Sequence, residues 1–263
     1  MLTDAAQMAG DLLWNCWQTG QTLVNGLPEH LRPVTRQDGY AIQALLERRS
    51  AAPLFGWKIA ATSQAGQAHI RVDRPMCGRL LAERVFEECT PVPFGSNSMR
   101  VAEAEFAFRM GQSLEPRDTL YAIPEVMDAV ATLHPAIEIP DSRYQDFVSV
   151  GAAQLIADNA CAHYFVLGAA APESWRCLDL AGHEVRARTA TVERSGSGAA
   201  VLGDPRAALA WLANELSGLG IVLAAGQVVT TGTCTIPLPI SPGDEVVSDM
   251  GMLGRVATRF SRD

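Results

Sequence analysis

The chain has 263 residues, of which 48% are hydrophobic and 19% are charged, and its formal net charge is −8 at pH 7. This composition is that of a globular protein with a sizeable core, and we expect one large domain with at most a small addition. The negative charge argues against nucleic acid and anionic membranes as partners, because both select basic surfaces.

The first residues, MLTDAAQMAGDLLWNCW, lack the basic leader of a signal peptide and include Asp4 and Asp11. No uncharged apolar run reaches the roughly 20 residues that span a bilayer. The six cysteines are scattered, without a CxxC pair that would indicate zinc or redox chemistry. We therefore expect a cytoplasmic protein with reduced thiols and no membrane partner.

Residues 1–53 are predicted to form a helical segment. Apolar residues from Ala5 to Trp17 recur at near-helical spacing, and "VTRQDGYAIQALLERRS" places another apolar stripe after a Thr35 cap. The stretch "GLPEHLRP" separates the two helices. From residue 54 the pattern changes to short strands with turn residues between them, so we predict a catalytic β-rich domain at 54–263.

The single lysine of the chain, Lys58, comes at the start of this second part, among 21 basic residues in all. It lies in "LFGWKIAAT", which is an apolar segment and not a polar loop. A codon bias towards arginine explains the shortage of lysine without explaining its presence here. Two roles stay open from the residues alone: a surface lysine that extends to water, or a functional group.

The segment "RVAEAEFAFRM" is the next predicted strand, and it has two glutamates on one face. In a strand, Glu103 and Glu105 lie on the same side, about 7 Å apart, while the two phenylalanines lie on an apolar core face. A third carboxylate, Glu138, follows in the short apolar strand "PAIEIP". Three buried like charges are very unfavourable unless a cation lies among them. Ligands that are all oxygen select a hard ion such as Mg²⁺, Mn²⁺ or Ca²⁺.

The glutamates of this strand have two alternative roles that the residues leave open. A solvated strand face is the ordinary cause of such a pattern, although its apolar neighbours Val101 and Ala107 argue against an open surface. A pair of carboxylates can also act as the acid and base of a glycosidase. Only 6% of the residues are aromatic, however, whereas sugar-binding clefts are usually rich in aromatic side chains.

The rest of the chain alternates irregularly between strands and helices. "IPEVMDAVATL" predicts a helix near a proline, and "GDPRAALAWLANELSGLG" predicts one that Asp204 caps, with Pro205 in the first turn and Gly218 or Gly220 at its end. "CLDLAGHEVRARTATVERSGSGAAVLG" predicts a hairpin with its turn at Gly182, and the C-terminal segment predicts three strands. This order indicates an α+β fold and not a doubly wound sheet.

Five blocks, in order, resemble the fumarylacetoacetate hydrolase superfamily over about residues 54–262. They are "VAEAEFAF", "PAIEIPDSRY", "LIADNACAHYFVLG", "AAVLGDPRAALAWLANEL" and "GQVVTTGTCTIPLPISPGDEV". Within the superfamily the chain is similar to the 2-oxo-4-pentenoate (2-hydroxypenta-2,4-dienoate) hydratases and 4-oxalocrotonate decarboxylases, and its helical N-terminal segment resembles theirs. The resemblance implies a rolled mixed β-sandwich after that segment, and a homo-oligomer.

The resemblance also implies the residues of an active site. It assigns Mg²⁺ or Mn²⁺ to Glu103, Glu105 and Glu138. The family's G-[YW]-K-[IV]-G-L-T-S stretch corresponds to "GWKIAATS", so Lys58 becomes the candidate catalytic proton carrier. We expect a pKa lowered towards neutrality for this lysine, beside a cation and in apolar surroundings, which an arginine cannot match. The candidate substrate-binding residues are Thr231, Thr233, Asp158, Arg143 and Met76.

Several of these candidates also have structural alternatives. Strand threonines are usually structural, and Asp158 with Asn159 suits a buried helix end or turn equally well. Arg143 has Asp141 and Asp146 nearby as ordinary ion-pair partners. Four histidines show no spacing typical of a site, and we interpret them as structural or surface residues: His69, His134, His163 and His183.

Two departures from the family pattern affect the predicted reaction. Met76 stands where many of the hydratases have an aspartate, and Cys161 stands where serine is common. Our first hypothesis is a Mg²⁺-dependent hydratase acting on a small 2-hydroxy-2,4-dienoate or 2-oxo-enoate in the breakdown of aromatic compounds. The alternatives are a 4-oxalocrotonate-type decarboxylase, an acylpyruvate C–C hydrolase, whose His–Glu pair is not evident near Lys58, and a non-enzymatic member that keeps the metal for stability.

Overall fold

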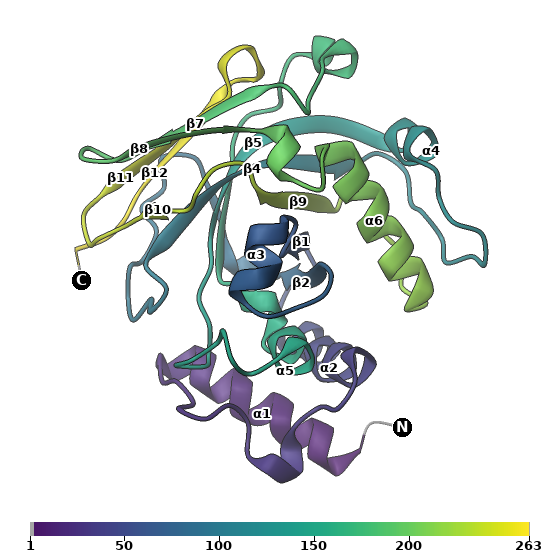
Figure 1. Ribbon diagram of the computed structural model, residues 1–263, viewed down its shortest axis with the longest axis vertical. Helices are drawn as coiled ribbons and strands as arrows, with labels where there is room; N and C mark the ends of the chain where they lie inside the picture. Colours follow the sequence, from purple (N-terminus) through teal and green to yellow (C-terminus); the bar gives the residue numbers. More distant parts are fainter. Residues whose placement is uncertain (1–2, 263) are drawn as a thin grey trace.

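A curled, mixed sheet forms the centre of the molecule (Figure 1), whose computed structural model describes residues 3–262. Its strands are β1 Gly56–Ala60, β2 Met76–Leu80, β3 Val85–Glu87, β4 Val101–Met110, β5 Val130–Ile139, β6 Tyr164–Leu167, β9 Val228–Thr233 and β10 Leu238–Pro239. The order is β2-β1-β9-β4-β5-β6-β3, with β10 paired to β4. The long strands β4 and β5 therefore form the middle of the sheet, with β9 and β1 beside them.

A second, smaller sheet packs against β4 and β5. Its strands are β7 Glu184–Arg188, β8 Glu193–Ser197, β11 Glu245–Asp249 and β12 Arg255–Arg259. They are antiparallel in the order β12-β11-β7-β8, and alternate residues of β7, such as Val185 and Ala187, are buried. Together the two sheets confirm the predicted α+β class and mixed β-sandwich.

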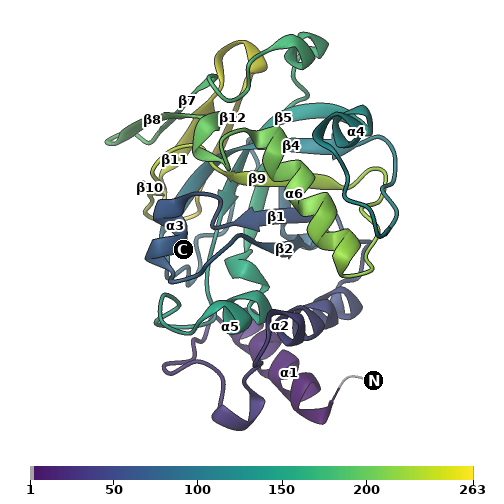
Figure 2. The ribbon, with the colours of Figure 1, turned by 45° about the vertical axis from the view of Figure 1, so that its right-hand side comes forward.

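Helices cover the ends and one side of the sheets (Figure 2). The α-helices are α1 Asp4–Thr19, α2 Arg36–Gln43, α3 Gln64–His69, α4 Ile123–Asp128, α5 Ala152–Ala157 and α6 Pro205–Gly218. The 3-10 helices are η1 Glu29–Leu31, η2 Ala44–Arg49, η3 Ala82–Arg84, η4 Asn159–Cys161, η5 Glu173–Cys177, η6 Gly198–Ala200 and η7 Gly251–Leu253. In the described part of the chain, none of these helices has the length and apolar character needed to span a membrane.

The N-terminal helices dock below the sheet through α5, which contacts α2. The Thr35 cap forms as predicted, because its hydroxyl accepts from the N–H of Asp38. Leu13 of α1 shares one apolar cluster with Tyr144 and Ala157. The N-terminal segment therefore supports the chain that follows β5, and a division into units at residue 53 stays a prediction.

Three predicted elements differ from the structure. The helix that starts at Ile123 ends at Asp128, and the apolar residues after it belong to β5. The turn of the β7–β8 hairpin lies after Thr189, whose hydroxyl accepts from two following N–H groups, and not at Gly182. The C-terminal segment forms four strands, not three, because a short β10 pairs with β4. Helix α6 begins as predicted, since Asp204 accepts from the N–H of Arg206.

Candidate functional site

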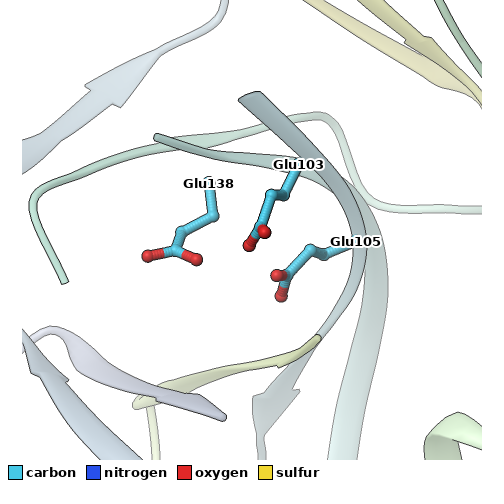
Figure 3. Close-up of side chains that lie close together, drawn as sticks. All are labelled: Glu103, Glu105 and Glu138. Atoms are coloured by element: carbon cyan, nitrogen blue, oxygen red, sulfur yellow. The ribbon is translucent and has the colours of Figure 1, made fainter. Parts of the chain in front are cut away.

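Three glutamates from the two central strands meet at one point (Figure 3). Glu103 and Glu105 project from β4, and Glu138 lies on β5 directly opposite Glu103 in the antiparallel register. One carboxylate oxygen from each lies within 4.8 Å of the others. Glu105 and Glu138 are fully buried and Glu103 is half-buried. Strand alternation thus sets two of the carboxylates, and strand pairing brings the third.

The oxygen atoms of these glutamates fit a hard divalent cation. The Oε2 atom of Glu105 accepts hydrogen bonds from the Thr230 hydroxyl and from the Gly232 N–H. Within the described residues, Oε1 of Glu105 and Oε1 of Glu138 accept no hydrogen bond. Buried oxygens without a donor are costly, and a cation among them would satisfy both. Carboxylate oxygens alone suit Mg²⁺ or Mn²⁺.

The raised pKa values of Glu103 and Glu105 also favour a cation at this site. Burial raises the pKa of Glu103 well above its ordinary value, and the repulsion from Glu138 adds to the rise. Burial and then the charge of Glu138 raise the pKa of Glu105 to about 8, against the opposing effects of Lys58 and Thr230. The folded chain therefore disfavours the charged forms of these two carboxylates unless a further positive charge joins them.

Lys58 lies beside this group on β1 and is 3% exposed. Its Nζ is 2.9 Å from Oε2 of Glu138 and donates to the carbonyl of Ala160 at 3.1 Å. Burial acts to lower the pKa of Lys58, but attraction to the three glutamates outweighs it and the pKa is raised. The predicted lowering is therefore wrong for this structure, because three carboxylates face one ammonium. A cation held by the carboxylates would offset part of that attraction.

The carbonyl that meets Lys58 is presented by a left-handed turn. Asn159, Ala160 and Cys161 have φ angles of 57°, 50° and 60°, which are uncommon for residues other than glycine. The turn approaches β2 so closely that a Cβ on Gly78 would lie 2.2 Å from the carbonyl of Asn159. Glycine at position 78, opposite Lys58 in the β1–β2 pair, is what permits this approach.

A cavity of about 720 Å³ opens beside the carboxylates. Four of the predicted residues line it: Lys58, Glu103, Met76 and Thr233. His69, which we interpreted as a structural or surface residue, is exposed and also lines the cavity, and its ring lies 6.2 Å from that of Phe147. His69 ends α3, the helix that directly follows the strand of Lys58. Its closeness to Lys58 in the chain is the sequence signal that could have indicated a position at the cavity.

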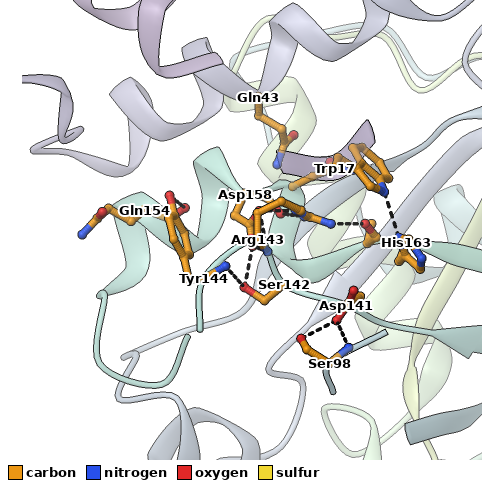
Figure 4. A network of polar contacts seen from close by, with 12 residues as sticks. Trp17, Gln43, Ser98, Asp141, Ser142, Arg143, Tyr144, Gln154, Asp158 and His163 are labelled. Carbon is orange, nitrogen blue, oxygen red and sulfur yellow. Dashed lines mark hydrogen bonds and ion pairs between the residues drawn. The ribbon is translucent and has the colours of Figure 1, made fainter. Parts of the chain in front are cut away.

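Two predicted substrate-binding residues form a buried ion pair instead (Figure 4). The guanidinium of Arg143 donates to Oδ1 of Asp158, and the Ser142 hydroxyl donates to Oδ2 at 2.7 Å. Arg143 and Asp158 are not among the described residues that line the cavity. The geometry does not support substrate contact for either, and Asp158 takes its structural alternative at the end of α5. Arg143 pairs with neither of the acidic neighbours, Asp141 or Asp146, that the sequence offered.

Of the threonines of β9, one lies in the core and two lie at the cavity or beside the glutamates. Thr231 is buried and its hydroxyl donates to the carbonyl of Phe106 at 3.1 Å, so its role in the structure is to join β9 to β4. The hydroxyl of Thr233 donates to the carbonyl of Thr235 at 2.9 Å at the cavity wall. The threonine that contacts a candidate metal ligand is Thr230, which no pattern in the sequence indicated.

Comparisons with known proteins agree with this site. The family model of the fumarylacetoacetate (FAA) hydrolase C-terminal region matches residues 47–261. The 2-keto-4-pentenoate hydratase of Paraburkholderia xenovorans (strain LB400) is 31% identical over 265 residues, covering 99% of this chain and 96% of that protein. The 2-oxo-hept-4-ene-1,7-dioate hydratase of Escherichia coli is 32% identical over 237 residues, covering 86% of this chain and 87% of that protein.

A solved structure is similar over the whole length. It is the 4-oxalocrotonate decarboxylase from Pseudomonas putida G7, complexed with magnesium and adipate. The TM-score is 0.89 at 27% identity, and the match covers 99% of each chain. The N-terminal helices and the sandwich are therefore shared with a protein that was solved with a divalent ion.

Proposed function

Because the chain belongs to the fumarylacetoacetate hydrolase family, we propose that it is a Mg²⁺- or Mn²⁺-dependent lyase that adds water to a 2-hydroxy-2,4-dienoate or 2-oxo-enoate in the breakdown of aromatic compounds. One observation carries the proposal: three glutamates, two of which have buried oxygens without a hydrogen-bond donor, adjoin a buried lysine at the wall of a large cavity. Relatives that are named as hydratases support the reaction, and the magnesium-bound neighbour supports the ion.

Each residue of the group has a role in this proposal. Glu103, Glu105 and Glu138 would hold the ion, which supplies a Lewis acid that stabilises negative charge on the C2 oxygen of the substrate. The Gly232 N–H, with the Thr230 hydroxyl, orients one oxygen of Glu105 and leaves the other available to the ion.

Lys58 is the residue that we assign to proton transfer. When a 2-hydroxy-2,4-dienoate becomes a 2-oxo-3-enoate, the C2 hydroxyl loses a proton and C5 gains one. Water then adds across the remaining double bond, with its hydroxyl at C4 and its proton at C3. Two observations support this assignment: Lys58 lines the cavity, and its Nζ lies 2.9 Å from Oε2 of Glu138, so its N–H groups are close to the proposed metal ligands.

Decarboxylation is the second candidate, and Met76 is the observation that favours it. This buried side chain lines the cavity, where an acidic residue would be expected to direct water. An apolar wall instead disfavours a substrate carboxylate and so assists the loss of carbon dioxide. We expect Met76→Asp to raise hydration relative to decarboxylation, with Met76→Leu as the control of similar volume. An unchanged ratio would show that position 76 does not border the reacting atoms.

The proposed function is tested by one assay panel. The protein is incubated with Mg²⁺ and a 2-hydroxy-2,4-dienoate, a 4-oxalocrotonate or an acylpyruvate, and turnover is followed by ultraviolet absorbance. Loss of the dienoate signal, abolished by EDTA and restored by Mg²⁺, is the expected result. Turnover that EDTA leaves intact contradicts the metal, and cleavage of the acylpyruvate alone contradicts the reaction.

The family resemblance also leads us to propose a homo-oligomer that acts in the cytoplasm. Light scattering on the purified protein measures the oligomeric state directly. A monomer at micromolar concentration contradicts the first part of the proposal, and secretion of the native protein contradicts the second.

A further inference from the structure

The lining of the cavity has one lysine or arginine side chain among the described residues. Among the described residues that line it, Lys58 is the single lysine, and arginine is absent. The Lys58 ammonium is already paired with Glu138 at 2.9 Å. The arginine that the sequence suggested as a carboxylate partner, Arg143, is paired with Asp158. A second carboxylate on a substrate therefore has no fixed cation to meet inside the cavity.

Most of the remaining lining is apolar. It includes aliphatic, thioether and aromatic side chains from the end of α3, the start of β4 and the residues before it, the loop between β5 and α5, α5 itself, and the segment after β9: Ile70, Met99, Val101, Phe147, Leu155 and Ile236. Ile236 is 71% exposed, so an apolar group also stands at the solvent side of this lining. His69 is the other group that can carry positive charge, and it is exposed, where water competes for an anion.

The volume of the cavity exceeds the needs of the smallest dienoate. At about 30 Å³ per atom, the volume that a water molecule occupies in the liquid, the eight non-hydrogen atoms of a five-carbon hydroxydienoate fill at most about 240 Å³. The cavity measures about 720 Å³. Space for a substituent thus remains beyond the reacting carbons.

We propose that the substrate carries an apolar alkyl or aryl group beyond C5 and no second carboxylate. This inference rests on the proposed function, since the proposed metal site fixes which end of the acid lies at the glutamates. A carboxylate in this mainly apolar lining, whose other polar groups are mostly hydroxyls, loses hydration without gaining a cationic partner. Each buried methylene of an alkyl tail instead strengthens binding by about fourfold. The chain would then differ from its relative named for a 1,7-dioate and from the neighbour solved with adipate.

The first test measures binding, so that it does not depend on turnover. The Mg²⁺-loaded protein is titrated calorimetrically with two unreactive saturated acids, 2-oxooctanoate and 2-oxoadipate. We expect 2-oxooctanoate to bind at least about tenfold more tightly. Equal affinity, or tighter binding of 2-oxoadipate, overturns the inference. Failure of the proposed function is a separate result, because it shows as absent turnover of every dienoate in the panel.

A variant sharpens the same test. Ile70 is half-buried at the end of α3, so Ile70→Arg adds a cation to the lining without opening the core. We expect this change to bring the two affinities within about threefold of each other, while Ile70→Leu keeps the order of the unmodified protein. If Ile70→Arg leaves the ratio unchanged, the lining near α3 does not contact the tail and the inference is overturned.

Discussion

Two clusters of buried charge in this chain are satisfied in opposite ways. In the first, Lys58 is the one cation for Glu103, Glu105 and Glu138, and three buried carboxylate oxygens accept no hydrogen bond from the described residues, one of them in the ion pair with Lys58. In the second, Arg143 faces one carboxylate that its own main chain and the Ser142 hydroxyl also contact. Burial of charge is therefore common to both clusters, whereas buried carboxylate oxygens without a donor are found, among the described residues, in the first cluster.

The second cluster joins segments of the fold. The Arg143 guanidinium lies 4.7 Å from the centre of the Trp17 ring of α1 and donates to the carbonyl of Ala162. Trp17 in turn donates to Nδ1 of His163 at 2.8 Å. The ion pair thus connects the N-terminal helix, the end of α5 and the loop after β5, which is a structural role.

The largest expected effect comes from removing a charge of the first cluster. Glu105→Gln keeps the shape of the side chain but takes away a ligand, so we expect calorimetry to show no Mg²⁺ binding and the assay to show no hydration. Without metal and above about pH 8, where Glu105 is charged, the same variant should be more stable than the unmodified protein, because one repulsive charge is gone. Unchanged Mg²⁺ affinity would contradict the assignment of the site.

The matched change in the second cluster should lower the stability of the protein and leave its Mg²⁺ affinity unchanged. Asp158→Asn leaves the Arg143 charge buried and uncompensated, which costs about 3–5 kcal/mol of unfolding free energy. Urea unfolding in EDTA measures this loss. At urea concentrations at which the variant is still folded, its Mg²⁺ affinity should stay near that of the unmodified protein. Loss of Mg²⁺ binding from a folded Asp158→Asn protein would mean that the two clusters are coupled.

Lys58→Arg separates charge from proton transfer within the first cluster. An arginine keeps the positive charge beside Glu138 but does not release its proton, so we expect Mg²⁺ binding to persist and hydration to fall by about 100-fold or more. Near-normal turnover would limit Lys58 to an electrostatic role. A folded variant with intact Mg²⁺ binding is the necessary control, because the site is buried.

A smaller effect is expected at the threonine that orients a ligand. Thr230→Val removes the hydroxyl that donates to Glu105 and keeps the volume of the side chain. We expect Mg²⁺ affinity to fall by about 10–100-fold, the usual range when a group that supports a metal ligand is lost. Thr231→Val is the control, since that hydroxyl meets the carbonyl of Phe106 and not a glutamate. Equal losses in both variants would point to a general strand effect.

The smallest effect is the pH dependence of the metal-free protein. The pKa of Glu105 is about 8 in the folded chain against an ordinary 4.5, because of burial and Glu138, opposed by Lys58, Thr230 and Gly232. Between these values the folded state binds more protons than the unfolded state, so stability is highest below about 4.5 on this account and falls as pH rises towards 8. Melting temperatures in EDTA should therefore be lower at pH 8 than at pH 6.

Mg²⁺ should reduce or reverse this slope, because it binds the deprotonated carboxylates. The Glu105→Gln variant is the control for the assignment, since it should have a flatter slope in EDTA. An equal slope in the two proteins would place the titrating group elsewhere in the chain.

The sequence predicted what depends on local periodicity. Strand alternation placed Glu103 and Glu105 on one face, and the apolar surroundings of Glu138 marked it as their partner. The capping and first-turn residues of α6 were also readable, because a helix start is signalled by its own residues.

The features that were missed depend on long-range pairing. Thr230 reaches Glu105 only because β9 lies between β1 and β4, and no local pattern sets that order. The Arg143–Asp158 pair likewise forms only because the end of α5 lies beside the loop that follows β5. Alternation determines the face of a strand but not its neighbour, so such contacts follow from the fold and not from spacing.

The register that sets Glu103 opposite Glu138 also affects how fast the chain folds. The β4–β5 pair is the longest in the sheet, and it cannot form in this register without bringing two like charges to adjacent positions. If this pair forms before the transition state for folding, the barrier includes a repulsion that a proton or a divalent ion would remove. In that case refolding should be faster in Mg²⁺ than in EDTA at pH 8, and the ion would assist folding before any substrate is bound.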